Sequence, residues 1–522
     1  MIFRSPFPDI SIPDTTLTEF VFQNSERFAA KPALVEGQTG RVLTYEELRG
    51  LVRRAAAGFA RAGLRKGDVV ALLSPNLPEY AVAFHGAAAA GLVVSTINPL
   101  CTAEEVSQQL RESGARLLVT APALFEKARE AAAGTGVSET FVFGGCEGAK
   151  PFEGLVAEEG TEPPRVELDP REDLAALPFS SGTTGVQKGV MLTHRNMVAN
   201  LLQIEGTGHA GPDDTLVCVL PLFHIYGMQV IMNYGLYVGA TLVVLPRFDL
   251  EEVLGVVQKY RVTMAHFVPP IMLALAKSPA VDAYDLSSLK AIFSAAAPLG
   301  RELGEQVSRR LGCFVKQGYG MTEAAPATHM IPPDPALDRP GSVGVPVPNT
   351  ECKVIDVGTG AELGPRQEGE ICLRGPQVMR GYLNRPEATA ESLDAEGWLH
   401  TGDIGYADEG AYFYVVDRAK ELIKYKGYQV APAELEALLL THPSVADVAV
   451  VPFPDDEAGE VPKAFVVLKP GCELTGDEVM EHVAARVGPH KRIRRVEFTG
   501  QIPKSPSGKI LRRLLRDAAR QN

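Results

Sequence analysis

The sequence has no long hydrophobic run, no regular cysteine spacing and no excess of positive charge. Its most apolar stretch, residues 81–94, contains a histidine and is shorter than the roughly 20 residues that a membrane-spanning helix needs. We therefore expect no membrane span. Residues 1–10 include proline and aspartate where a secretory signal needs an apolar core, so we also expect a cytoplasmic protein.

Other absences exclude whole classes of function. The seven cysteines show no C-x-x-C spacing, which favours reduced core thiols over a metal site or disulfides. A net charge of -13 argues against nucleic acid as a partner, because phosphate backbones select positive surfaces. Neither G-x-S-x-G nor H-E-x-x-H occurs, so a serine hydrolase and a zinc protease have no support.

Short β-rich runs alternate with helical patterns along most of the chain, which predicts an α/β fold. From Gly341 onward, short strands and turns predict a β-rich subdomain, and a βαβ-like block after Asp417 predicts a small, mobile α+β domain. A chain of 522 residues exceeds what one core usually organises. We therefore predict a large N-terminal domain over residues 1–416 and a C-terminal domain over residues 417–522.

The most distinctive loop reads SSGTTGVQKG, between two predicted strands. Its glycines permit a tight turn that exposes backbone N–H groups, its hydroxyls add donors and Lys188 adds positive charge, so the loop suits an anion. It is not a Walker A loop, because the G-K-[S/T] ending is missing. Taken alone, a flexible Gly/Ser turn is the simpler alternative.

Further motifs follow in order: PLFHIYG, FSAAAPLG, QGYGMTEA, GEICLRG, WLHTGD, VDRAKELIKYKGYQVAPAELE and PKSPSGKILRR. With them, the chain from Pro32 onward resembles the acyl-adenylate-forming superfamily of acyl-CoA ligases, luciferases and nonribosomal peptide adenylation domains. It looks most like 4-coumarate:CoA ligases and their bacterial relatives. The departures are mild: Gln187 replaces a usual proline, Ala295 and Ala325 replace common glycines, and Tyr428 replaces a common phenylalanine.

The resemblance implies a reaction in two steps. A carboxylate and ATP give an acyl-AMP and pyrophosphate, and the thiol of coenzyme A then displaces AMP to form a thioester. The first step builds negative charge beside a triphosphate, so cations and backbone N–H dipoles must dominate the site. The implied small molecules are ATP, Mg²⁺, coenzyme A and a carboxylic acid, and the sequence sets no oligomeric state.

By this resemblance, the Ser/Thr/Gly loop would cradle the β- and γ-phosphates, Thr322 would contact the α-phosphate and Glu323 would hold Mg²⁺. Tyr319 would stack on adenine, while Asp403 and Arg418 would contact the ribose. Taken without their motifs, Thr322 and Glu323 would be interpreted as the start of a helix. An isolated aspartate after glycine, such as Asp403, would be interpreted as a turn residue, and an isolated Asp-Arg pair as a surface ion pair. The full ATP/AMP set is Ser180, Ser181, Gly182, Thr183, Thr184, Gly185, Lys188, Gln317, Gly318, Tyr319, Gly320, Met321, Thr322, Asp403, Arg418 and Lys509.

Lys509, in the turn SPSGK, is the predicted catalytic lysine of the first step, where its charge would neutralise the attack. The loss of such a donor typically costs on the order of 10²–10³ in rate. His224 would stand beside the acyl carboxylate, although a lone histidine after an apolar strand is often a core residue. The predicted catalytic set is Lys509, His224, Thr322 and Glu323.

One arrangement cannot hold pyrophosphate and also admit a thiol. The resemblance therefore implies that the small domain rotates about a hinge at Asp417. The residues assigned to coenzyme A are Arg247, Lys426 and Gly427, and those assigned to the acyl-AMP are Lys420 and Lys424.

The acyl pocket is predicted to be walled by Ile225, Tyr226, Ala296, Gly320, Ala324, Ala325 and Pro326. Small walls with one tyrosine suit a flat aromatic ring, and the Tyr226 hydroxyl could address a phenol. We favour a hydroxycinnamate or related aryl acid, with a medium- or long-chain fatty acid as the alternative.

Three more distant readings stay open. A luciferase-like oxygenase would share every nucleotide motif and would need a bound luciferin. A carrier-protein adenylation domain would usually adjoin a carrier segment, and none is apparent. A noncatalytic acyl-nucleotide sensor would be expected to lose Lys509 or Glu323, and the sequence has both.

Overall fold

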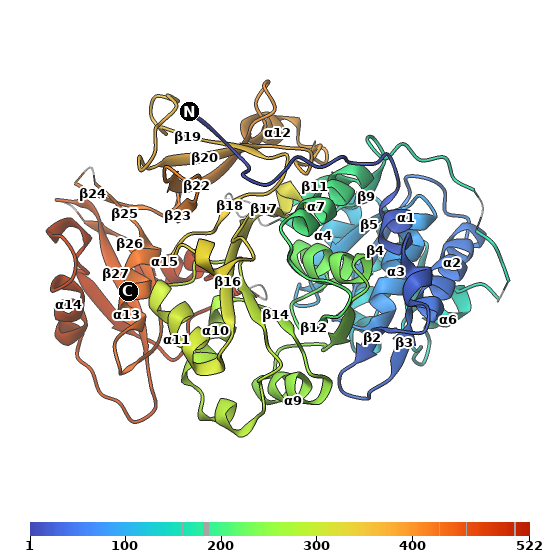
Figure 1. Cartoon of the computed structure of the whole chain (residues 1–522), viewed down its shortest axis with the longest axis horizontal. Helices are drawn as coiled ribbons and strands as arrows, with labels where there is room; N and C mark the ends of the chain where they lie inside the picture. Colours follow the sequence, from blue (N-terminus) through green and yellow to red (C-terminus); the bar gives the residue numbers. More distant parts are fainter. Residues whose placement is uncertain are drawn as a thin grey trace.

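The computed structural model describes residues 1–158, 160–163, 165–180, 187–426, 428–455, 457–505 and 508–521. Over these residues the strands form four sheets, with helices packed against them (Figure 1). The expected α/β class is confirmed. No helix in the described ranges is long and apolar enough to cross a membrane.

The first sheet has parallel strands at its centre and helices on both faces. Along the central strand β4, Val70 and Leu72 pack into one core cluster, while Ala71 and Leu73 pack into another on the opposite face. This burial on both sides explains why the strand is entirely apolar. The strands, in order, are β10 (Phe179–Ser180), β11 (Lys188–Thr193), β9 (Leu174–Ala176), β5 (Val93–Ile97), β4 (Val69–Leu73), β6 (Ala115–Thr120), β7 (Glu139–Val142) and β8 (Lys150–Pro151), with β21 (Gly381–Tyr382) paired to β11.

The helices beside this sheet start at well-formed caps. Thr44 and Glu47 form a capping box at the first turn of α2, and a cap of this kind typically stabilises a helix by about 1 kcal/mol. Gly86 of α3 lets the two helices approach closely, because a Cβ there would lie 2.6 Å from the Cβ of Ala55. The helices are α2 (Tyr45–Arg61), α3 (Pro78–Ala89), α4 (Ala103–Ser113), α5 (Phe125–Ala132) and α6 (Phe152–Leu155).

The second sheet positions most of the motifs. Six neighbouring strands of this sheet run parallel: β2, β13, β12, β14, β15 and β16. Their carboxyl ends therefore share one edge, where ligands of open α/β sheets bind. Its strands, in order, are β18 (Val345–Pro346), β17 (Ala327–Met330), β16 (Phe314–Gly320), β15 (Ala291–Ser294), β14 (Met264–Phe267), β12 (Thr215–Cys218), β13 (Thr241–Val244), β2 (Pro32–Glu36) and β3 (Val42–Thr44). The helices of this region are α1 (Leu17–Phe22), α7 (His194–Gly206), α8 (Tyr234–Tyr237), α9 (Leu250–Tyr260), α10 (Pro269–Lys277) and α11 (Arg301–Leu311).

The third sheet is the β-rich part expected after Gly341, and all its strand pairs are antiparallel. Its order is β1 (Ile2–Arg4), β19 (Glu351–Ile355), β20 (Gly369–Arg374), β22 (Leu399–Ala407) and β23 (Phe413–Arg418), with α12 (Pro386–Ser392) beside it. The N-terminal strand β1 joins this sheet from the far end of the sequence (Figure 1), which the sequence did not suggest.

The C-terminal lobe, residues 423–521, contains the fourth sheet and has a core cluster of its own, running from Ile423 to Ile493. It lies beside α11 and β16 of the second sheet (Figure 1). The domain boundary proposed at Asp417 stays a prediction. The lobe's elements are β25 (Tyr428–Val430), β24 (Ile423–Tyr425), β27 (Gly459–Leu468), β26 (Val445–Asp455), β28 (Arg495–Phe498), α13 (Pro432–Leu440), α14 (Gly476–Ala484) and α15 (Arg512–Gln521).

Candidate active site

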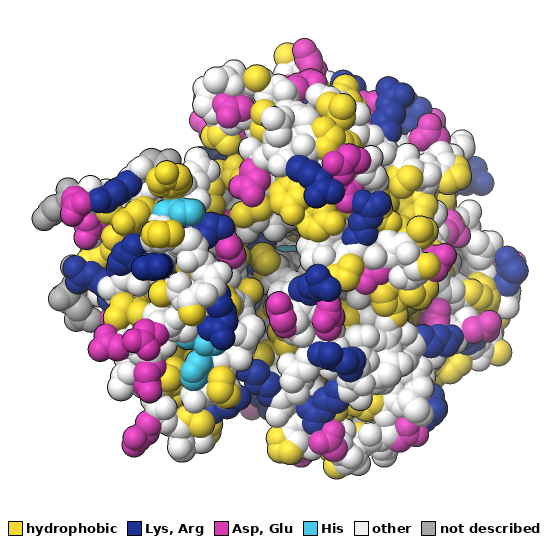
Figure 2. Space-filling model, turned by 60° about the vertical axis from the view of Figure 1, so that its left-hand side comes forward, with side chains coloured by type: hydrophobic (Ala, Val, Ile, Leu, Met, Phe, Trp, Pro, Cys, Tyr) yellow, Lys and Arg dark blue, Asp and Glu magenta, His cyan; other side chains and the backbone are white. Residues whose placement is uncertain are grey.

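A cavity of about 340 Å³ lies where the second sheet, the β-rich sheet and the C-terminal lobe meet. The space-filling view shows a hollow at the centre of this face (Figure 2). The cavity collects many residues that the sequence analysis singled out: Lys188, His224, Ile225, Tyr226, Ala296, Gly318, Tyr319, Gly320, Met321, Thr322, Glu323, Pro326, Arg418, Lys420 and Lys509.

Other predicted site residues lie elsewhere. Gln317 lines a separate cavity of about 290 Å³, and Ala324 and Ala325 are fully buried and are not among the described residues that line the main cavity. Arg247 and Lys424 are exposed, and Lys426 is exposed and paired with Glu457. Six predicted residues lie outside the described part of the chain: Ser181, Gly182, Thr183, Thr184, Gly185 and Gly427.

Tyr319, Asp403 and Arg418 form one hydrogen-bonded group. The Tyr319 hydroxyl donates to Asp403 Oδ2 at 2.5 Å, and Arg418 Nε lies 3.3 Å from Oδ1. Strand pairing of β22 with β23 places Asp403 opposite Arg418. Burial raises the pKa of Asp403, while the Arg418 charge and the Tyr319 hydroxyl oppose that rise. Asp403 is not among the described residues that line the cavity, but its partners Tyr319 and Arg418 are, so the group lies beside it.

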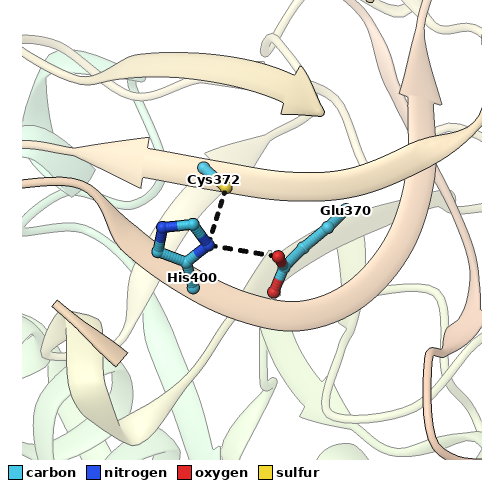
Figure 3. A group of neighbouring side chains, drawn as sticks. All are labelled: Glu370, Cys372 and His400. Carbon is cyan, nitrogen blue, oxygen red and sulfur yellow. Dashed lines mark hydrogen bonds and ion pairs between the residues drawn. The ribbon is translucent and has the colours of Figure 1, made fainter. Parts of the chain in front are cut away.

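The part of β22 that carries Asp403 is held by a second group, to which the sequence analysis assigned no role. His400 Nδ1 lies 3.1 Å from Glu370 Oε2 and 3.5 Å from the Cys372 sulfur (Figure 3). Glu370 Oε1 in turn accepts the N–H of Gly402 at 2.8 Å. The motifs GEICLRG and WLHTGD contain these residues. The motifs could therefore have pointed to them, but the sequence analysis gave these three residues no role.

Glu370, Cys372 and His400 are also the described residues whose ligand atoms lie close enough together to hold a metal ion. Glutamate, cysteine and histidine are all zinc ligands. However, burial raises the pKa of the Cys372 thiol to about 12, and the ligand is the thiolate. The hydrogen bonds to strand β22 beside Asp403 account for the group without a metal.

Lys509 lies in a turn of the C-terminal lobe that packs against the second sheet. Gly508 has φ +80°, and a Cβ there would lie 3.0 Å from the Val268 side chain, so a glycine suits this close approach. The Lys509 N–H donates to Ser505 Oγ at 3.1 Å, which closes the turn. Burial and the neighbouring Arg418 lower the pKa of Lys509, against the opposing charge of Asp403.

His224 follows β12 and lies two residues before a π-helical segment, Tyr226–Asn233, a feature often found at functional sites. Burial lowers the pKa of His224 to about 3, and the Lys509 charge acts in the same direction, so the ring is neutral at pH 7. The backbone N–H of Tyr226 donates a hydrogen bond to Nδ1 of His224 at 3.3 Å. Nδ1 is therefore the acceptor, and the ring proton belongs on Nε2.

The apolar end of the cavity is formed by Ile225, Tyr226, Val230, Phe293, Ala296, Pro326 and Met330. The Tyr226 hydroxyl donates to the backbone oxygen of Phe293 at 3.2 Å, so it already has a partner. Glycine at 320 lets the chain pass close to the Pro326–Ala327 backbone, because a Cβ there would lie 2.3 Å from the Pro326 oxygen.

A buried histidine pair lies behind this apolar end. His209 Nε2 and His266 Nε2 are 2.8 Å apart, and the ring of His209 packs edge to face on Phe293 at 4.9 Å. The ring of His266 packs edge to face on Tyr226 at 5.8 Å. Burial lowers the pKa of His266 to about 3 and the pKa of His209 well below its usual value. The pair is therefore neutral at pH 7 and supports two residues that line the cavity.

Comparison with known families gives two matches along the chain. Residues 21–383 match the family described as AMP-binding enzyme, and residues 434–509 match the AMP-binding enzyme C-terminal domain. A curated relative, 4-coumarate–CoA ligase 3 of Oryza sativa subsp. japonica, is 48% identical over 526 residues, which cover 99% of this chain and 94% of the relative.

Solved structures share the whole fold. The anthranilate CoA ligase AuaEII in complex with anthranoyl-AMP has a TM-score of 0.89 at 26% identity, covering 98% of each chain. ATP-bound MatB from Rhodopseudomonas palustris has a TM-score of 0.88 at 29% identity, covering 97% of this chain and 99% of MatB. Apo MatB from the same organism has a lower TM-score, 0.78, to this chain. The arrangement of this chain is thus more similar to ATP-bound MatB than to apo MatB.

Proposed function

The chain belongs to the AMP-binding enzyme family, and from that premise we propose that it is an ATP-dependent carboxylic acid:CoA ligase acting through an acyl-AMP. We propose 4-coumarate or a related hydroxycinnamate or aryl acid as its substrate. The observation that carries the proposal is that Lys509 of the C-terminal lobe lines the same cavity as His224, Thr322 and Glu323. Two parts of the chain thereby meet around one reaction centre.

In the first half reaction, the acid's carboxylate attacks the α-phosphorus of ATP and pyrophosphate leaves. Lys509 and Thr322 donate to the phosphate oxygens on which charge develops, as preorganised donors in a partly buried site do. Asp403 accepts from the ribose hydroxyls, and its bond from Tyr319 fixes its orientation. Ser180 to Gly185 and Lys188 contact the β- and γ-phosphates.

Glu323 fits the role of a magnesium ligand. Its Oε1 accepts a hydrogen bond from Ser180 Oγ at 2.8 Å, and no described residue donates to its Oε2. Carboxylate oxygens are the protein ligands that Mg²⁺ prefers. Mg²⁺ bound there would offset the charge of the triphosphate.

His224 supports the acid end of the substrate. Its neutral ring accepts the Tyr226 N–H at Nδ1 and therefore presents an N–H at Nε2. That donor suits a carboxylate oxygen before the attack and the acyl oxygen after it. No proton has to leave the ring in either step.

The aryl substrate rests on the shape of the cavity and on the relatives. Small residues at Ala296 and Gly320 and the ring of Phe293 leave a narrow apolar end, which suits a flat ring. The curated relative is named for 4-coumarate, and AuaEII carries an anthranoyl-AMP. A medium- or long-chain fatty acid is the alternative that the same apolar walls admit.

The second half reaction requires a different position of the lobe. Asp417 joins the two parts: its Oδ1 accepts the Arg418 N–H at 2.8 Å and its Oδ2 accepts the Ala433 N–H at 2.9 Å. We propose that rotation about Asp417 withdraws Lys509 and brings Lys426 and Gly427 to the thiol arm of coenzyme A. Lys420 and Lys424 would then contact the acyl-AMP, and Arg247 a phosphate of coenzyme A.

The test is AMP release that depends on both coenzyme A and acid, with ATP and Mg²⁺, across 4-coumarate, caffeate, cinnamate, benzoate, octanoate and palmitate. We expect hydroxycinnamates to give the highest kcat/KM and Lys509→Ala to lose the activity. Preference for octanoate or palmitate would overturn the aryl assignment. Absence of AMP with every acid, or full activity of Lys509→Ala, would overturn the ligase assignment.

A further inference from the structure

Tyr382 lines the cavity and belongs to a segment that none of the recognised motifs covers. It lies in the short strand β21, which pairs antiparallel with β11 and places Tyr382 opposite Val190. The N–H of Leu383 donates to the Gly189 oxygen at 2.8 Å and continues this pairing. The Tyr382 backbone is therefore tied directly to the strand that follows the phosphate loop.

The Tyr382 side chain joins the two charged residues proposed to act on the triphosphate. Its hydroxyl donates to Glu323 Oε1 at 2.9 Å, and the ammonium of Lys188 lies 4.8 Å from its ring centre. The residue is 7% exposed, so water competes little for either contact. A cation over an aromatic face gains about 0.5–2 kcal/mol, more as it loses water.

The geometry at Glu323 explains why this hydroxyl matters. Ser180 Oγ also donates to Oε1, at 2.8 Å, so two hydroxyls fix the same oxygen and orient the carboxylate. The opposite oxygen, Oε2, accepts neither bond.

We propose that Tyr382 is a positioning residue for the adenylation step: its hydroxyl orients Glu323 with Oε2 turned to the divalent cation, and its ring holds Lys188 beside the phosphate loop. This inference rests on the proposed function and deepens it. It assigns a role to a residue that binds neither the acid nor coenzyme A.

The first experiment compares Tyr382→Phe with the parent chain. The variant keeps the ring and loses only the donor, so we expect the Mg²⁺ concentration for half-maximal AMP formation to rise about tenfold. The rate at saturating Mg²⁺ should fall less than threefold. Tyr406→Phe, a change on the β-rich sheet in a tyrosine stacked on Tyr414, is the matched control and should behave as the parent.

A binding measurement separates positioning from a general loss of structure. Free Mn²⁺, counted by electron paramagnetic resonance in the presence of ATP, reports cation binding without turnover. Tyr382→Phe should weaken Mn²⁺ binding by a similar factor, and thioester formation from added acyl-AMP should stay as in the parent. Ser180→Ala and the double variant Tyr382→Phe/Ser180→Ala should show non-additive effects, because both hydroxyls bond one oxygen.

Unchanged Mn²⁺ binding and an unchanged Mg²⁺ requirement in Tyr382→Phe would overturn the inference and leave the proposed function intact. A uniform loss, in which thioester formation from added acyl-AMP falls as much as adenylation, would also overturn it, because the residue would then act on the fold. A parent chain that forms no AMP with any acid would remove the proposed function itself.

Discussion

The hydroxyl of Tyr319 donates a hydrogen bond of 2.5 Å to the carboxylate of Asp403, 84 positions further along the chain. The bond links the end of β16 in the second sheet to β22 in the β-rich sheet. Both residues belong to motifs that the sequence analysis assigned separately, one to the adenine and one to the ribose. Because of this contact, we expect a substitution at Tyr319 to change the orientation of the Asp403 carboxylate.

Tyr319→Phe tests this unit. The variant keeps the ring and removes the donor to a buried carboxylate, a hydrogen bond worth about 1.5–3 kcal/mol. We expect the KM for ATP to rise about tenfold or more, with a smaller change in the KM for the acid. Tyr412→Phe, which removes a hydroxyl bonded to the Leu337 oxygen, is the control. Equal effects in the two variants would contradict a role at the nucleotide.

Lys509→Met tests the two half reactions separately. AMP formation from acid and ATP should fall on the order of 10²–10³, the usual effect of losing a preorganised donor. Thioester formation from added acyl-AMP should change little, because the proposed rotation withdraws Lys509 before that step. Arg513→Met, at an exposed position nearby, controls for the loss of a positive charge. A parallel loss in both half reactions would argue against the rotation.

The low pKa of His224 predicts a flat pH dependence for its contribution. With a pKa of about 3, the ring is already neutral at pH 5 and stays neutral at pH 8. The ratio of kcat/KM between the parent and His224→Asn should therefore be constant over this range. A ratio that changes with a midpoint near 6.5 would show that the ring titrates in the free enzyme.

The histidine pair behind the cavity predicts how stability depends on pH. In the native chain, burial holds the pKa of His266 at about 3 and that of His209 well below its usual value, while in the unfolded chain each histidine titrates near 6.5. The unfolded state then binds more protons, so stability falls as pH drops from about 6.5 towards 3. With a native pKa of about 3, His266 alone should cost about 2 kcal/mol of stability between pH 7 and pH 5, and His209 should add to this loss.

The variant His209→Leu/His266→Leu should therefore lose less stability than the parent between these two pH values. Urea unfolding at pH 7 and pH 5 measures the difference, whatever the absolute stability of the variant. His490→Gln is the control, because its ring stacks on the exposed Tyr428 and is not buried. An identical loss in the parent and the double variant would mean that the pair is accessible to protons in the native state.

The sequence predicted the site best where a motif follows a parallel strand. His224 after β12 and the residues at the end of β16 come together because carboxyl ends of parallel strands share one edge of the sheet. Tyr382 could not be found in this way. Its position depends on the pairing of β21 with β11, a long-range contact that leaves no local pattern in a strand of two residues.

The sequence also did not show which side chains point into the cavity. Ala324 and Ala325 precede Pro326 in one run, yet Pro326 lines the cavity and the two alanines are buried. Ala325 has a φ of 57°, in the left-handed region, so the chain turns sharply there and simple periodicity fails. Glu370 and His400 were visible as motif residues, but only the pairing of β20 with β22 shows that they hold the strand beside Asp403.

Phe293 lines the cavity, and we expect its ring to set the depth of the acyl pocket. A Cβ at Gly318 would lie 2.4 Å from the tip of this ring, and His209 packs against the ring edge at 4.9 Å. Phe293→Ala should therefore lengthen the pocket at its closed end while leaving the phosphate contacts in place. We expect kcat/KM for octanoate relative to cinnamate to rise about 10- to 100-fold, since discrimination of one methylene is worth about 1–3 kcal/mol.

The control is Phe314→Ala, because Phe314 borders the separate cavity that contains Gln317. If the preference moved equally in both variants, or not at all in Phe293→Ala, the ring would not set the length of the acid, and the apolar end bounded by Val230 and Met330 would have to set it instead.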